Sequence, residues 1–268
     1  MPKISIIMGA YNCQNTVCQS IDSILAQTFN DWEFIICDDA STDNTLSILN
    51  QYKAKYPDKF IILQNSTNMG LSASLNKCLE NAKGEFIARM DADDISLPDR
   101  FEKQINFLIN NSEVNLVSTA MQHFDDSGIH DIVLPVQNPN KYTLRNSVPF
   151  FHATIMTYKS VYDKLNGYTV SERTKRAQDY DLWFRFYHAG FVGQNLNEVL
   201  YLVREDKNAI RRRTVKSRIN AFKTTCIGFK LLNFPRYWII KPFFLMIFKS
   251  LIPFFVIDLY KQYQRKRK

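Results

Sequence analysis

Residues 84–100 read GEFIARMDADDISLPDR, so an apolar run leads directly into a group of aspartates. The run Phe86-Ile87-Ala88 is typical of a strand that is covered on both faces. Four carboxylates follow it within a few residues: Asp91, Asp93, Asp94 and Asp99. Their mutual repulsion would cost stability in a protein core. We therefore expect this strand to end at a ligand site.

The same strand pattern recurs on both sides of this stretch. Before it and within it, short apolar runs lie at residues 3–8, 33–37, 60–64 and 85–90, separated by helical patterns at 15–27, 43–55 and 71–82. This alternation predicts an α/β fold with a mostly parallel sheet and right-handed crossovers. Further along we expect helices at 99–111 and 178–190, strands at 114–119, 152–157 and 196–203, and a hairpin with loops within 120–150.

Four polar turns follow the four expected parallel strands. They are Ala10-Tyr11-Asn12, Asp38-Asp39-Ala40-Ser41, Asn68-Met69-Gly70 and Asp91-Ala92-Asp93-Asp94. Ligands of open parallel sheets bind outside the carboxyl ends of the strands, so these turns predict one ligand crevice. Carboxylates suit Mg²⁺ or Mn²⁺, whose protein sites leave places for substrate phosphates. We expect Asp91 and Asp93 to bind such a cation, whereas Asp99, and in part Asp94, would cap the turn and helix that follow.

Several familiar site classes are absent from the sequence. It has no GxGxxG after the first strand, no GxxxxGK[ST] loop and no GxSxG, and its four histidines lack metal-ligand spacing. A nucleoside diphosphate would then depend on a metal and on basic side chains. The five cysteines show no paired spacing, which indicates a reducing compartment. The first residues read as a strand and not as a signal peptide, so we expect the catalytic part in the cytoplasm.

The charge is divided unevenly along the chain. Residues 1–203 contain 17 Lys and Arg against 23 Asp and Glu, whereas residues 204–268 contain 17 against 3. The basic part includes YWIIKPFFLMIFKSLIPFFVIDLY (237–260), which is too apolar for a solvated nucleic-acid-binding arm. Its mixture of aromatic and basic residues favours attachment to an anionic membrane surface. A spanning or re-entrant segment, and a helix packed on the protein's own core, remain alternatives.

Seven segments, in order, resemble the family 2 inverting glycosyltransferases, and most closely those that build bacterial capsule, exopolysaccharide or lipopolysaccharide. The segments are SIIMGAYN (5–12), SILAQTF (23–29), CDDASTDNT (37–45), NMGLSASLN (68–76), GEFIARMDADDISLPDR (84–100), HATIMTYKSVY (152–162) and QDYDLWFR (178–185). The resemblance implies a GT-A fold over residues 1–205, with a nucleotide-binding half at about 1–100 and an acceptor half at about 101–205. Residues 206–268 would form the helical, membrane-associating extension.

The resemblance also implies roles for individual residues. Asp39 would read the nucleobase and Tyr11 would stack near it, and Asp93 with Asp91 would hold the metal. Asp179 would be the catalytic base, with Asp181 as its rival. The remaining implied contacts are Ala10, Asn68, Asp91 and Ala92 with the donor nucleotide, and His152 and Trp183 with the acceptor. Arg204 either contacts a phosphate or simply begins the basic segment.

The expected function is transfer of one sugar, with inversion, from a nucleotide-diphosphate sugar to a lipid-linked saccharide, dependent on Mn²⁺ or Mg²⁺. A UDP-sugar is the first expectation for the donor, with dTDP and GDP as alternatives. The enzyme would lie on the inner face of the cell membrane and would not bind nucleic acid. Processive synthases carry Q-x-x-R-W, which this sequence lacks. The alternatives are a sugar nucleotidyltransferase and a non-enzymatic membrane- or nucleic-acid-binding scaffold.

Overall fold

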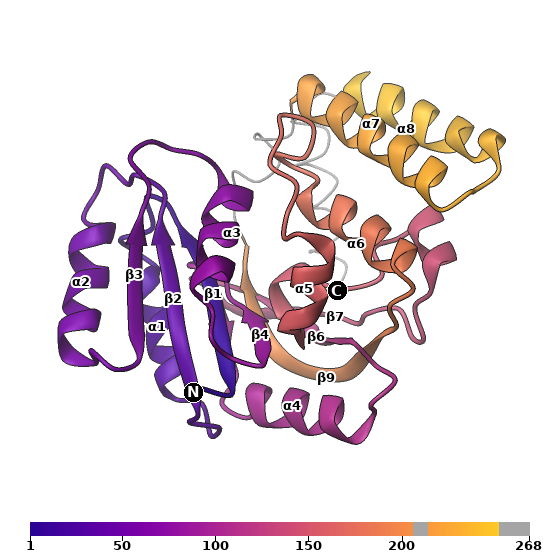
Figure 1. Ribbon diagram of the computed structural model, residues 1–268. Helices are drawn as coiled ribbons and strands as arrows, with labels where there is room; N and C mark the ends of the chain where they lie inside the picture. Colours follow the sequence, from indigo (N-terminus) through magenta and orange to yellow (C-terminus); the bar gives the residue numbers. More distant parts are fainter. Residues whose placement is uncertain (206–213, 252–268) are drawn as a thin grey trace.

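The computed structural model describes residues 1–205 and 214–251 (Figure 1). Their strands form one mixed sheet in the order β3-β2-β1-β4-β8-β6-β9-β5, with β7 paired to β6. Helices flank this sheet on both faces, so the expected α/β architecture is confirmed. Residues 206–213, where we expect the catalytic domain to give way to the extension, lie outside the described residues. The division into two domains therefore stays a prediction.

The first half of the sheet is parallel, as predicted. Its strands are β1 (Ile4–Ala10), β2 (Trp32–Asp38), β3 (Phe60–Gln64) and β4 (Phe86–Arg89). The helices between and after them are α1 (Val17–Leu25), α2 (Thr45–Lys55), α3 (Leu71–Asn81) and α4 (Arg100–Asn110). Ile6 and Ile7 on β1 belong to different core clusters, because successive side chains of a strand point to opposite faces. The sheet is therefore buried on both sides.

The second half contains antiparallel and longer-range pairings. β6 (Leu116–Asp125) forms a hairpin with β7 (Gly128–Val133) and pairs in parallel with β9 (Gly193–Arg204). The two-residue β5 (Ile95–Ser96) pairs with β9, and the three-residue β8 (Met156–Tyr158) lies antiparallel between β4 and β6. Short helices α5 (Lys159–Leu165) and η1 (Lys141–Arg145) complete this half, with α6 (Gln178–His188) after α5.

The predicted strand at 152–157 is wrong in its first half. Residues His152–Thr154 form a 3₁₀ turn, η2. The Thr154 hydroxyl donates to the carbonyl of Phe151 at 3.0 Å and accepts the N–H of Thr119 at 3.0 Å. A side chain thus takes over bonds that a strand ladder would make through the backbone.

The start of the C-terminal extension packs on the protein's own core. α7 (Val215–Leu231) lies against α6, where Gly228 is so close to the Phe184 ring that an added Cβ would approach it to 2.1 Å. The Phe229 and Phe184 rings are 5.9 Å apart, and Phe229 is buried. Phe234, just before η3 (Arg236–Ile239), and Trp238 within it continue this contact, with ring centroids 4.9 Å apart. Within the apolar segment 237–260, Trp238 takes part in this core packing, while the alternatives for the segment as a whole stay open.

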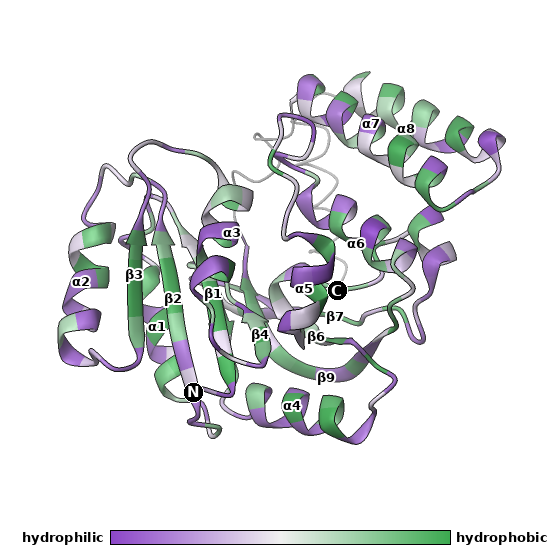
Figure 2. Ribbon diagram, in the orientation of Figure 1, coloured by the Kyte–Doolittle hydropathy of each residue, from purple (hydrophilic) through white to green (hydrophobic). Residues whose placement is uncertain are grey.

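The following helix is different. α8 (Ile240–Leu251) lies beside α7 and is largely hydrophobic (Figures 1 and 2). Many of its apolar side chains are exposed: Ile240, Phe243, Phe244, Leu245, Ile247, Phe248 and Leu251. No helix in residues 1–205 and 214–251 is long and apolar enough to cross a membrane. The remaining apolar and basic residues of the tail, from 252 on, lie outside the described part.

Candidate active site

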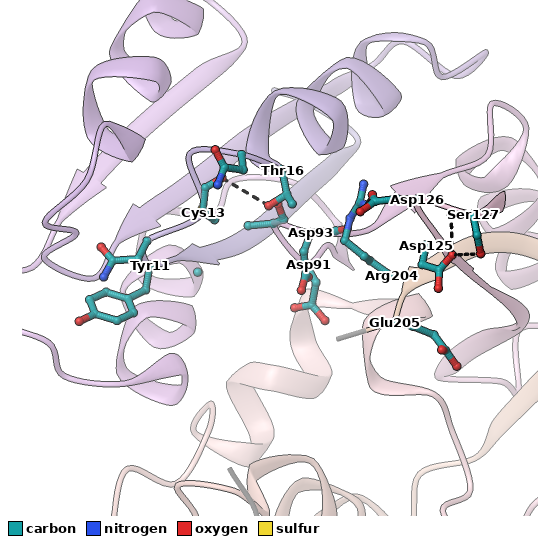
Figure 3. Close-up of a pocket in the computed structure, with 14 residues that line it drawn as sticks. Tyr11, Cys13, Thr16, Asp91, Asp93, Asp125, Asp126, Ser127, Arg204 and Glu205 are labelled. Atoms are coloured by element: carbon teal, nitrogen blue, oxygen red, sulfur yellow. Dashed lines mark hydrogen bonds and ion pairs between the residues drawn. The ribbon is translucent and has the colours of Figure 1, made fainter. Parts of the chain in front are cut away.

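A cavity of about 980 Å³ opens at the carboxyl edge of the parallel strands (Figure 3). Its walls come from the β1–α1 loop, the β4–β5 turn, the β6–β7 turn and the end of β9. Five of the residues predicted from the sequence line it: Tyr11, Asp91, Ala92, Asp93 and Arg204. The chain therefore brings the expected donor, metal and phosphate contacts together at one place.

The β1–α1 loop is held open by side-chain hydrogen bonds. Asn12 adopts a left-handed backbone conformation (φ 48°), and its Oδ1 accepts the N–H of Thr42 at 2.8 Å. The Thr16 hydroxyl donates to the carbonyl of Ala92 at 2.9 Å, which joins this loop to the acidic turn. Tyr11 projects from the loop with 49 % of its surface exposed. An aromatic face is thus presented at the cavity, where a nucleobase could stack.

Asp91 is paired with a buried arginine on the strand that leads to it. Arg89 donates Nη2 and Nη1 to the two carboxylate oxygens of Asp91, at 2.6 and 3.2 Å. Burial alone would lower the pKa of Arg89, but the Asp91 charge opposes it and the pKa is raised. A bidentate pair of this kind fixes the orientation of the carboxylate. Asp91 nevertheless keeps 31 % of its side chain exposed toward the cavity.

The next two aspartates have different environments. Asp93 is exposed in the cavity, whereas Asp94 is buried and accepts the N–H of Arg204 at 2.8 Å. Burial, together with the charges of Asp91 and Asp93, raises the pKa of Asp94 well above its usual range. Asp99 precedes α4 but makes no capping side-chain bond, and instead pairs with Lys103 at 2.7 Å. The capping expectation for Asp99 is therefore wrong, and Asp94 has a structural role.

The donor set fits a divalent cation that also binds substrate. Asp91 and Asp93 supply carboxylate oxygens at the cavity, and no group of three or more His, Cys, Asp or Glu within the described residues forms a complete metal cage. Mg²⁺ and Mn²⁺ need only one or two carboxylates when substrate phosphates and water complete the shell. Burial is the main cause of the raised pKa of Asp94, and the negative charges of Asp91 and Asp93, which such a cation would offset, add to it.

Arg204 is the cationic side chain in this acidic cavity. Its Nε donates to the Asp93 carbonyl at 3.1 Å, and Nη1 lies 3.4 Å from a carboxylate oxygen of Asp126. Its guanidinium carbon stands 4.5 Å from the centroid of the Phe124 ring. Of the two interpretations of Arg204, the position beside Asp93 favours a phosphate contact, because the arginine fork matches phosphate oxygens.

Asp39 lies next to the cavity but does not line it. Its carboxylate accepts hydrogen bonds from Asn65 Nδ2 and from the N–H groups of Met69 and Gly70, each at 2.8 Å. Its own N–H donates to the carbonyl of Ala10 at 2.8 Å. A carboxylate offers about four acceptor sites, so roughly one remains on Oδ2. Asn68 is exposed beside it. The nucleotide contacts of Ala10, Asp39 and Asn68 stay predictions.

The proposed base, Asp179, is the second residue of α6. It accepts the N–H of Tyr180 at 2.8 Å. Burial raises the pKa of Asp179, while the Tyr180 N–H and the charge of Arg89 partly oppose the shift. A carboxylate with a raised pKa is a better proton acceptor than an ordinary aspartate. Asp179 is thus chemically suited to the predicted role, and Arg89 links it electrostatically to Asp91.

Its rival, Asp181, is fully engaged in the structure. It is buried and accepts from Thr169 Oγ1 at 2.7 Å, Arg173 Nη2 at 2.8 Å and Arg185 Nε at 2.9 Å. Burial would raise the pKa of Asp181, but these three partners lower it. An ionised carboxylate held by two arginines is a poor proton acceptor. The geometry therefore favours Asp179 over Asp181.

On the expected acceptor side, His152 and Trp183 behave differently from each other. His152 Nε2 is 2.8 Å from the Tyr168 hydroxyl, which lies 2.7 Å from that of Tyr162. Burial and the Arg89 charge lower the pKa of His152 well below its usual range, so it is neutral. Trp183 has no exposed surface and packs edge-on behind His152 at 5.8 Å. The prediction that Trp183 contacts the acceptor must be corrected, because it is a core residue.

The sequence interpretation missed several cavity residues. Asp125, Asp126 and Ser127 come from the β6–β7 turn, and Glu205 follows β9. Asp125 is held by Ser127 and His130, whose hydrogen bonds lower its pKa. The region was expected to be a hairpin, but no local signal indicated that its turn would face the acidic motif. Only the long pairing of β6 with β9 brings it there.

Comparisons with known proteins agree with this geometry. The profile of the family described as "Glycosyl transferase family 2" matches residues 5–165. EpsE of Bacillus subtilis, whose name places it among the glycosyltransferases, is 48 % identical over 213 residues, covering 80 % of this chain and 77 % of its own. WfaP of Escherichia coli is 29 % identical, covering 74 % and 76 %. Its name describes a β-1,3-glucosyltransferase that uses UDP-Glc and an α-D-GlcNAc-diphosphoundecaprenol.

Two solved structures share the fold. Residues 1–349 of TarS from S. aureus, in complex with UDP-GlcNAc, superpose with a TM-score of 0.71 at 17 % identity, covering 92 % of this chain and 72 % of that one. The mannosyltransferase PcManGT of Pyrobaculum calidifontis, with GDP-Man and Mn²⁺, gives 0.63 at 19 % identity, covering 98 % and 80 %. At these identities the likeness establishes the architecture.

Proposed function

Since the chain belongs to glycosyl transferase family 2 and is a glycosyltransferase, we propose that it transfers a single sugar with inversion from a UDP-sugar to a lipid-linked saccharide. The acceptor would be an intermediate in the assembly of a bacterial surface polysaccharide. One observation carries this proposal. The exposed Asp93, the oriented Asp91, Tyr11 and Arg204 line a single cavity that has room for a nucleotide and its diphosphate.

On the donor side, Tyr11 offers its ring to the base, and the remaining acceptor site on Asp39 suits an N–H of a nucleobase. Asp93 and Asp91 would hold Mn²⁺ or Mg²⁺, which when bound would stabilise negative charge on the diphosphate. Arg204 lies beside Asp93, where its guanidinium can neutralise a further phosphate oxygen. The Arg89–Asp91 pair keeps Asp91 in place before the donor arrives.

On the acceptor side, Asp179 takes the proton of the acceptor hydroxyl. That oxygen forms a bond to the anomeric carbon as the bond from this carbon to the diphosphate oxygen breaks. The nucleoside diphosphate leaves with the electron pair, and attack from the opposite side turns an α-linked donor into a β-glycoside. The raised pKa of Asp179 supports this role. Neutral His152, held by Tyr168, would give the acceptor a hydrogen bond without a competing charge.

The names of similar proteins support the choice of substrates. WfaP uses UDP-Glc and a diphosphoundecaprenol-linked saccharide, and the TarS structure contains UDP-GlcNAc. PcManGT binds GDP-Man, so GDP remains an alternative to UDP. The exposed apolar side chains of α8, next to Arg236 and Lys241, suit attachment of the enzyme to an anionic membrane that holds such an acceptor.

Thermal unfolding of the purified protein tests the donor assignment. UDP, dTDP, GDP and CMP are each added with Mn²⁺ and with EDTA. A ligand at 100 times its Kd should stabilise the folded state by about 2.7 kcal/mol, which raises the Tm by several degrees. We expect the shift for UDP only when Mn²⁺ is present. A shift for GDP alone would replace UDP by GDP, and no shift with any nucleotide would overturn the proposed function.

A further inference from the structure

A second cavity, of about 200 Å³, lies between the turn at residues 171–177 and the beginning of α7. Its charged lining residues are three cations and one acid: Lys175, Arg176, Lys216 and Glu172. Lys216 pairs with Glu172 at 3.1 Å, in a contact where both side chains are mostly exposed. Lys175 and Arg176 form no ion pair with any residue in the described ranges. Three cations against one acid leave the lining of the hollow with a net positive charge.

The walls of this basic cavity are fixed by hydrogen bonds. Arg173 donates Nη1 to Thr224 on α7 at 3.1 Å and Nη2 to Asp181 on α6 at 2.8 Å. Asn220 on α7 donates Nδ2 to the carbonyl of Glu172 at 2.8 Å. Within the turn, the hydroxyl of the buried Thr174 donates to the carbonyl of Thr169 at 2.6 Å. The cations are thus carried on a backbone that is anchored to two helices.

The cavity adjoins the proposed catalytic base. Arg176 precedes Asp179 by three residues, so their Cα atoms lie no more than about 11 Å apart. Between them, Ala177 is buried and its N–H donates to the Thr174 carbonyl at 2.9 Å, which joins the turn to the first residues of α6. A group bound by Lys175 and Arg176 would therefore lie at the end of α6 that carries Asp179, the residue proposed to activate a hydroxyl.

On its other side, the cavity adjoins the apolar surface of α8. A short connection makes α7 and α8 an antiparallel pair (Figure 1), and the rings of Phe222 and Phe243 meet at 5.7 Å. One helical turn is 3.6 residues. About two turns back along α7 from Phe222 lies Thr214, and about two turns forward along α8 from Phe243 lies Leu251, so these two residues are level with each other. Thr214 lines the basic cavity, and Leu251 therefore lies at its rim. Leu251 is 74 % exposed and Phe248, one turn earlier, 64 %.

A base, a basic hollow and an exposed apolar surface thus follow one another along the molecule. A lipid-linked saccharide has the same order of groups: a sugar hydroxyl, a diphosphate and an apolar chain. Guanidinium and ammonium groups bind phosphate oxygens directly, and they do so more strongly in a hollow than on a flat surface. Building on the function proposed above, we propose that Lys175, Arg176 and Lys216 bind the diphosphate of the acceptor, while its lipid lies along α8.

The test uses binding, so that the acceptor sugar need not be known. The full-length protein is kept saturated with UDP and Mn²⁺ to fill the donor cavity, with both ligands at the same concentration in every solution. Farnesyl diphosphate is titrated into it by calorimetry, and the heat of the same titration without protein is subtracted. Three further titrations test the origin of the binding. Pyrophosphate tests a free anion, farnesol tests the lipid chain, and phosphatidylglycerol vesicles test a lipid headgroup. The test variant is K175Q/R176Q, and K53Q/K55Q removes two exposed charges from α2 as a matched control.

We expect farnesyl diphosphate to bind more tightly than pyrophosphate or farnesol, and K175Q/R176Q to weaken it at least tenfold while K53Q/K55Q does not. Equal binding of farnesyl diphosphate to both variants overturns the assignment. So does a loss confined to the vesicles, or a pyrophosphate affinity equal to that of farnesyl diphosphate. The stabilisation by UDP with Mn²⁺ is recorded for each variant. If it is present in every variant, a failure here concerns the acceptor site alone, and the proposed function stands.

Discussion

The described residues form two cavities of opposite charge, and Asp179, the proposed base, is a lining residue of neither. The larger cavity is lined by five acidic residues and one arginine: Asp91, Asp93, Asp125, Asp126, Glu205 and Arg204. The smaller has three cations and one glutamate. Both are proposed to hold a diphosphate. The acidic cavity can do so only through a divalent cation, whereas the basic cavity needs none.

This difference gives each substrate its own dependence on conditions. Removing metal should abolish donor binding and leave acceptor binding intact. Raising the ionic strength should weaken acceptor binding first, since the basic side chains are exposed and are screened by salt. If both cavities had the same charge, neither would discriminate between the donor diphosphate and the acceptor diphosphate. Opposite charge separates them, because each substrate is disfavoured in the site of the other.

The largest effect is expected from the proposed catalytic base. Asp179→Asn removes the proton acceptor and should lower kcat by about 100- to 10,000-fold. In the wild type, burial raises the pKa of Asp179, so kcat/KM should fall as the pH drops through that raised pKa. Steady-state kinetics across pH 4–9 measure both effects. A variant with substantial turnover would remove Asp179 from the reaction.

The same substitution should not cost stability. A carboxylate whose folded pKa is raised contributes stability below its unfolded pKa and loses it as the pH rises through the folded pKa. At a pH above that folded pKa, the ionised Asp179 therefore destabilises the fold, and Asp179→Asn should unfold at the same or a higher denaturant concentration than wild type. A clear loss of stability would mean that Asp179 has a structural partner like that of Asp181.

Asp181→Asn should have the opposite profile. It leaves Arg173 and Arg185 without their carboxylate partner, which should cost about 3 to 5 kcal/mol in the free energy of unfolding. The folded pKa of Asp181 is lowered, so its contribution is present above the unfolded pKa and is lost as the pH falls through the folded one. Urea unfolding of wild type and variant at pH 7 and pH 4 measures the loss of unfolding free energy and its decrease at low pH.

Because Arg173 also anchors the turn that carries Lys175 and Arg176, Asp181→Asn sharpens the comparison between the cavities. At a temperature where the variant is folded, it should bind UDP and Mn²⁺ as wild type does, but bind farnesyl diphosphate more weakly. Asp163→Asn, an exposed aspartate paired with Lys159 on α5, is the matched control. Equal weakening of both ligands would show that the two cavities are not independent.

Asp93→Asn acts on the acidic cavity alone. It removes the exposed carboxylate that we assign to the metal, and the stabilisation of about 2.7 kcal/mol by UDP with Mn²⁺ should largely disappear. Farnesyl diphosphate binding should be unchanged, because the basic cavity lies elsewhere. Differential scanning fluorimetry with UDP, with and without Mn²⁺, measures the first effect. Full retention of the Mn²⁺-dependent shift would exclude Asp93 as a metal ligand.

The acidic cavity could be predicted from the sequence because its key residues directly follow strands, and each strand is identified by a local apolar run. Phe86-Ile87-Ala88 identifies the strand, and Asp91 and Asp93 directly follow it. Once the strands are known to be parallel, their carboxyl ends must meet, so Tyr11 and Asp93 were predicted together although they are 82 positions apart. Asp179 was implied only by the resemblance of QDYDLWFR to the family, and its role stays a prediction.

The part of the acidic cavity formed by the β6–β7 turn, and the whole basic cavity, could not be predicted from the sequence, because they depend on contacts between distant elements. Asp126 reaches the acidic cavity through the pairing of β6 with β9. Lys216 and Arg176 line one cavity because the turn at 171–177 is bonded to α7. The periodicity of α7 gave no clear apolar face, and its contacts rest on Gly228 and Phe229. Trp183 misled for a related reason, because a residue type cannot tell an exposed aromatic from a buried one.

The smallest effect on the fold is expected from α8, beyond the rim of the basic cavity. Phe244 and Phe248 are four residues apart on one face, 63 % and 64 % exposed, so Phe244→Glu with Phe248→Glu should change unfolding by no more than about 0.5 kcal/mol. Each phenylalanine that enters a membrane contributes roughly 1.5 to 3 kcal/mol, so the double variant should dissociate from anionic vesicles. Ile109→Glu on α4, at a residue 54 % exposed, is the control and should stay bound. Sedimentation with phosphatidylglycerol vesicles compares the double variant with this control. If the double variant still sediments, α8 is not the membrane-binding surface of the protein, and the lipid of the acceptor must leave the basic cavity by another path.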